Sequence, residues 1–95
     1  MYMGLNKQLR DVLEQLIDDT ITQSADFVNI ARSFRPLVSN DADFALGIAV
    51  GEIIGGFYNY FTVMNRRAMN QEELLEMYYI IRGRAEEMKR AILGT

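Results

Sequence analysis

The chain has 95 residues, the size of one domain, with 49% apolar residues, 24% charged residues and a formal net charge of −3. It contains no cysteine and no histidine, which excludes zinc sites built on these ligands, disulfides, thiol nucleophiles and Ser–His catalytic pairs. The apolar content is too high for a disordered chain, and the acidic balance disfavours nucleic acid as a partner. Residues 1–8 lack an apolar run, so we expect no signal peptide and a cytoplasmic protein.

Two breaks divide the single domain, residues 1–95, into three predicted helices. Residues 35–41 contain the only proline of the chain, followed by three side chains of the kind that cap helices. A weaker break lies at residues 66–70, where Asn70 and Glu73 form a variant of the capping box. The predicted helices cover about 5–34, 42–66 and 71–93.

The predicted helix 5–34 has one apolar face that polar residues interrupt near its middle. If it forms a hairpin with the helix 42–66 that turns near residue 38, Ser24 faces Glu52, the only carboxylate of residues 44–64. This pairing suggests a buried polar layer made of Thr20, Gln23, Ser24 and Glu52, with the alternative that Glu52 simply reaches water. A continuous helix over 5–34 would be roughly 45 Å long, more than the diameter of a compact domain of this size. Whether it breaks near Ser24 is open.

The predicted helix 42–66 is apolar nearly all round, so it must be buried on most of its sides. Gly47, Gly51 and Gly55 lie on one face at spacings of four, although each costs about 1 kcal/mol relative to alanine in a helix. We interpret them as a self-association face where a second helix approaches closely. The sequence therefore predicts an all-α, elongated antiparallel three-helix bundle, assembled as a homodimer with the helix 42–66 at its centre. It does not separate a dimer from a tetramer.

Three apolar residues of the predicted helix 71–93 fall outside its core stripe and require another contact. They are Leu75, Tyr79 and Ile80. We interpret them as a surface for a partner protein, with completion of the homodimer as the alternative.

Catalytic, cofactor and metal sites have no residue pattern in this chain, so we expect a protein that is not an enzyme. The expected function is non-catalytic protein–protein interaction, as a small adaptor or regulatory subunit that forms a homo-oligomer. Two alternatives remain open. Residues 44–64 are long enough to span a membrane once, although Glu52 near the centre costs about 3 kcal/mol. Carboxylates such as Glu73 and Glu76 could instead hold a divalent metal in a small helical enzyme.

Overall fold

The computed structural model describes residues 4–95, and within this range it contains helices and loops but no strand. The predicted all-helical class is confirmed. Five helices stand in place of the three that the sequence predicts. They are α1 (Lys7–Thr22), α2 (Ser24–Ser33), α3 (Asp41–Asn65), α4 (Gln71–Gly83) and α5 (Ala85–Leu93).

Three of these helices begin at a capping asparagine. The side-chain oxygens of Asn6, Asn40 and Asn70 each accept a hydrogen bond from the backbone N–H three residues further along. At the start of α4, the Glu73 carboxylate accepts from the Asn70 N–H at 2.8 Å, which completes the predicted capping box. These bonds satisfy backbone donors that the first turn of a helix leaves unpaired. The local sequence therefore determines where α3 and α4 begin.

The predicted helix 5–34 is divided at Gln23, whose backbone angles (φ −95°, ψ 15°) depart from those of a helix. The hydroxyl groups of Thr20 and Ser24 donate hydrogen bonds to carbonyl oxygens of the preceding turn. Such bonds compete with the helical backbone and bend helices. The polar interruption of the apolar face thus marks the break between α1 and α2.

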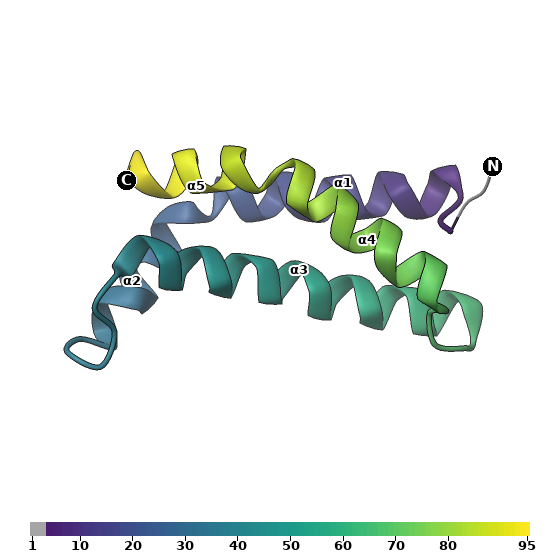
Figure 1. Ribbon diagram of the computed structural model, residues 1–95, viewed down its shortest axis with the longest axis horizontal. Helices are drawn as coiled ribbons and strands as arrows, with labels where there is room; N and C mark the ends of the chain where they lie inside the picture. Colours follow the sequence, from purple (N-terminus) through teal and green to yellow (C-terminus); the bar gives the residue numbers. More distant parts are fainter. Residues whose placement is uncertain (1–3) are drawn as a thin grey trace.

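The prediction of one helix over 71–93 is corrected, because the chain is divided at Arg84 (φ −110°, ψ 5°). Gly83, a weak helix former, directly precedes the break. The Arg84 guanidinium lies 2.9 Å from the Glu14 carboxylate and 2.8 Å from that of Asp18, both on α1. As a result, α4 crosses the molecule obliquely, whereas α5 follows the long axis beside α1 (Figure 1).

The core follows one side of α3, along a row of residues spaced by four that are at most 1% exposed. The two small residues at the start of this row pack with α2 and the end of α5 in one cluster. The three larger residues pack with α1, α4 and α5 in a second cluster. We call this row the inner ridge of α3; it consists of Ala45, Ala49, Ile53, Phe57 and Phe61.

The described part of the chain is elongated, measuring 43 × 21 × 19 Å. Helix α3 has 25 residues, so it is about 37 Å long and extends over most of this length (Figure 1). It packs against α1, α2 and α5. The molecule is therefore both elongated and broken in its first predicted helix. The three most extensive helix–helix contacts all involve α3.

Candidate self-association surface

The side of α3 opposite the core carries a second row of residues spaced by four. Each of these residues is two positions in sequence from a residue of the inner ridge. Two positions correspond to about 200° around a helix, so the two rows lie on opposite sides of α3. All of them are exposed. We call this row the outer ridge of α3; it consists of Asp43, Gly47, Gly51, Gly55, Asn59 and Val63.

Nothing within the described residues requires glycine on the outer ridge. A Cβ atom added at Gly47, Gly51 or Gly55 would meet no atom within 4 Å. No described glycine has a positive φ, so the backbone would also accept other residues. Each exposed glycine costs about 1 kcal/mol of helix stability relative to alanine. The structure therefore places the three predicted glycines together on an open face without an intramolecular use for them.

Apolar side chains border the outer ridge. Ile48 and Ile54 are half-buried beside it, and Tyr58 beside it is 38% exposed, while Val63 at the end of the ridge itself is 61% exposed. Helix α3 is long and apolar enough to cross a membrane by length and composition, and only 28% of its most apolar 18-residue window is buried. Helix α3 is therefore the most apolar helix, and its outward side is not covered by the other described residues of the chain.

The predicted polar layer does not form inside the single chain. Thr20 and Ser24 are 4% and 5% exposed, but both hydroxyl groups donate to backbone carbonyl oxygens of α1, those of Leu16 and Ile21. Gln23 and Glu52 are both exposed. Glu52 lies on the row of α3 that borders α1 and α2, but its side chain is exposed, so the four residues do not form a buried layer within the described chain.

The predicted partner surface on α4 is only partly available. Leu75 and Tyr79 are 58% and 79% exposed, whereas Ile80 is half-buried and packs against the core. Tyr78, which the sequence pattern assigns to the core stripe, is 46% exposed. Burial and the neighbouring Tyr78 hydroxyl group raise the pKa of Tyr58 on α3. This contact joins the exposed side of α4 to the C-terminal half of α3.

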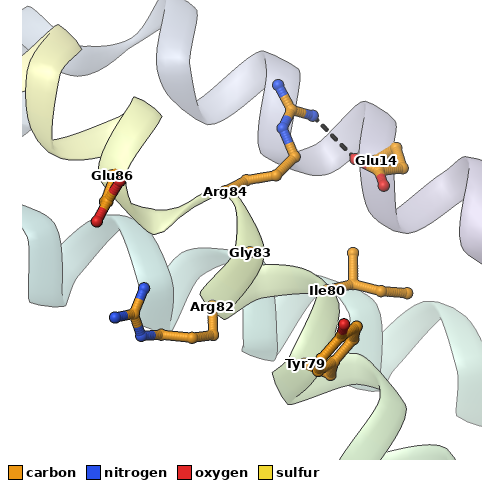
Figure 2. Close-up of a pocket in the computed structure, with 7 residues that line it drawn as sticks. All are labelled: Glu14, Tyr79, Ile80, Arg82, Gly83, Arg84 and Glu86. Carbon is orange, nitrogen blue, oxygen red and sulfur yellow. Dashed lines mark hydrogen bonds and ion pairs between the residues drawn. The ribbon is translucent and has the colours of Figure 1, made fainter.

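A shallow hollow of about 510 Å³ lies at the break between α4 and α5 (Figure 2). Arg84 points from it towards α1, where its ion pairs with Glu14, Asp18 and Glu87 raise its pKa, the bond to Glu87 contributing most. Arg82 points away from Glu14, on the other side of the helix. Among residues 4–95 it takes part in no ion pair.

The carboxylates considered as metal ligands serve other contacts. Glu73 is 5% exposed and binds the Arg67 guanidinium through two bonds of 2.8 Å, which hold the pKa of Glu73 below its usual range. Glu76 accepts a hydrogen bond of 2.7 Å from the Leu5 N–H. In the part of the chain that the structure describes, no three potential metal ligands lie close together.

Comparisons of the chain with protein-family models, with curated proteins and with solved structures find no match. What the chain does must therefore be inferred from its own residues and their geometry.

Proposed function

We propose that this protein is a non-catalytic interaction module, a small adaptor or regulatory subunit, that forms a homodimer through the outer ridge of α3. In this proposal each chain is a bundle of three antiparallel passes, α1–α2, α3 and α4–α5, and α3 lies at the centre of the dimer. The observation that carries the proposal is the open glycine row: it lowers the stability of the single chain and meets nothing inside it.

A second copy of α3 accounts for both properties of this face. Glycines at spacings of four let two helix backbones approach closely, as they do in packed membrane helices. The bordering Ile48 and Ile54, together with Tyr58 and Val63, would then lose water contact, which stabilises association by roughly 25 cal/mol for each Å² of apolar surface buried. A self-complementary patch of this kind is typical of two-fold dimers.

Solution mass tests the proposal directly. Light scattering after size exclusion, without detergent and over a range of concentrations, is expected to give twice the chain mass. Gly51→Leu is expected to raise the dissociation constant at least tenfold, because the side chain separates the two backbones. A monomer at all concentrations overturns the proposal.

Gly83→Leu is the matched control for this substitution. A Cβ atom at Gly83 also meets nothing within 4 Å, but the residue lies in the hollow at the end of α4 and not on α3. The mass and the dissociation constant of this variant are expected to equal those of the parent chain. Equal losses in both variants would point to a general effect of added apolar surface.

Leu75 and Tyr79 support the adaptor part of the proposal, because both are exposed apolar side chains on α4. We expect Leu75→Asp with Tyr79→Asp to keep the dimer mass and the helical circular dichroism while losing any second protein that co-purifies. Loss of the dimer itself would reassign this surface to self-association.

A single membrane span is the second candidate function, and the length and low burial of α3 favour it. It requires α3 to leave α1, which would expose the other side of the core around Leu13 and Ile17. Extraction of the expressed chain from membranes only by detergent would support the span. Recovery of a folded helical protein in detergent-free buffer would contradict it.

A further inference from the structure

Two exposed charges lie at the same level on opposite sides of the outer ridge. Glu52 belongs to the row of α3 that borders α1 and α2. In that row, the ring of Phe44 packs 5.3 Å from the ring of Phe34, and the Cβ position of Gly56 lies 3.8 Å from Leu16 of α1. Glu52 stands between these two contacts, one position after Gly51 at the centre of the ridge.

Arg82 lies on the other side of the ridge, where α3 borders α4 and α5. Lys89 of α5 pairs with Asp43 of α3 at 2.7 Å, and the side chain of Tyr78 of α4 lies near that of Tyr58 of α3. Because Arg82 lies between Tyr78 and Lys89 in sequence, it is level with the middle of the α3 segment between these contacts, close to Glu52. A hollow of about 340 Å³ that Arg82 lines together with Leu46 of α3 places Arg82 on this side of α3.

Neither charge is held in an ion pair within the described chain, although Glu86 lines the same hollow as Arg82. Glu52 and Arg82 are exposed and form no ion pair among residues 4–95. Other charged residues of these helices are paired, since Asp43 binds Lys89 and Glu14 binds Arg84. The face proposed for self-association thus has an acid on one flank and a base on the other.

We infer that two copies of this chain pack with their α3 helices parallel, so that Glu52 of each copy pairs with the partner's Arg82. The inference rests on the proposed homodimer and specifies its orientation. A two-fold axis parallel to α3 at the outer ridge places the Glu52 side of one copy next to the Arg82 side of the other. Corresponding residues of the two copies stay at the same height along the helix. Each acid then meets a base, and the pair forms twice.

The antiparallel alternative brings like charges together. A two-fold axis perpendicular to α3 at Gly51 makes the two helices antiparallel. Each side of the ridge then lies next to the same side of the partner's ridge. Glu52 then faces the partner's Glu52, and Arg82 faces the partner's Arg82. Opposed like charges disfavour an arrangement more reliably than an exposed ion pair strengthens one. Charge therefore selects between two arrangements that the glycines alone would both permit.

Charge reversal tests the pairing. Glu52→Arg and Arg82→Glu are each expected to raise the dissociation constant of the dimer about tenfold, and the double variant is expected to restore it. Arg90→Glu is the matched control, because Arg90 is also exposed and free of ion pairs among the described residues, but lies on α5 away from α3. A dimer that both single reversals leave unchanged overturns the inference.

Spin-label distances test the orientation independently, and the cysteine-free chain allows a single label without background. Val63 is exposed and follows Gly51 by 12 residues, about 18 Å along the helix. Labels at Val63→Cys are expected within about 25 Å of each other in parallel helices that cross at about 40°. Separations of about 36 Å or more would show antiparallel helices. A monomer would refute the proposed function, whereas an antiparallel dimer would refute only this inference.

Discussion

The two sides of α3 have opposite relations to the rest of the chain. The side chains of the inner ridge become larger from Ala45 to Phe61, and every residue on it is at most 1% exposed. The outer ridge has glycine at three consecutive positions of the row, and a Cβ atom added at any of them would have no other atom within 4 Å. Packing inside the chain accounts for the residue types of the first row and for none of the glycines of the second. The comparison shows that the fold of the single chain explains the residues on one side of α3 and leaves the glycines on the other side unexplained, which is why we propose that side for self-association.

The largest expected effect comes from removing a side chain of the inner ridge. Phe57→Ala deletes a fully buried ring in the middle of the larger cluster and is expected to lower the free energy of unfolding by about 3–5 kcal/mol. Val63→Ala, on the outer ridge, is expected to change it by less than about 0.5 kcal/mol in the dissociated chain. Urea titrations of dilute samples measure both. Similar losses would remove the distinction between the two sides.

A smaller effect is expected at Glu73, the one buried charged side chain among residues 4–95. Glu73 has a lowered pKa in the folded chain because Arg67 binds it, so its contribution to stability is present above the unfolded pKa of the carboxyl group. That contribution is lost as the pH falls through the lower, folded pKa. Glu73→Gln is expected to cost about 1–2 kcal/mol at pH 7 and little at strongly acidic pH. Urea titrations at several pH values measure this, and an equal cost at all pH values would contradict the charge-based explanation.

Exchanging small residues between the two ridges sharpens the comparison most directly. Ala49→Gly is expected to destabilise the dissociated chain by about 1 kcal/mol, and Gly51→Ala to stabilise it by about the same amount. At concentrations where the chain associates, Gly51→Ala is expected to weaken the dimer instead. Thermal unfolding of dilute and concentrated samples separates the two effects. Stabilisation by Gly51→Ala at every concentration would leave the glycine row without an explanation.

The smallest effect is expected where α3 ends. Arg66 has a positive φ of 58°, a left-handed conformation that costs a residue with a Cβ atom about 1 kcal/mol. Arg66→Gly is expected to stabilise the chain by about 0.5–1 kcal/mol without affecting either ridge. A shift in thermal midpoint with an unchanged dissociation constant would agree. A loss of stability would show that the Arg66 side chain makes contacts that offset the strain.

Local signals in the sequence predict the starts of α3 and α4 correctly, because Asn40 and Asn70 act on backbone groups within their own first turn. The division at Arg84 is missed, because it depends on Glu14 and Asp18, which are distant in sequence. The exposure of Glu52 and Tyr78 is missed for a related reason. Periodicity gives the face of a helix on which a residue lies, but not which faces the neighbouring helices cover.

The ion pair between Arg84 and Glu14 also has a consequence for how the chain folds. It joins residues 70 positions apart, so it can form only after α1 and the C-terminal segment have come together. Before that contact, the capping box at Asn70 and the apolar periodicity favour one continuous helix over residues 71–93. The break between α4 and α5 is then a late event in folding, in which a straight helix bends as α5 docks along α1.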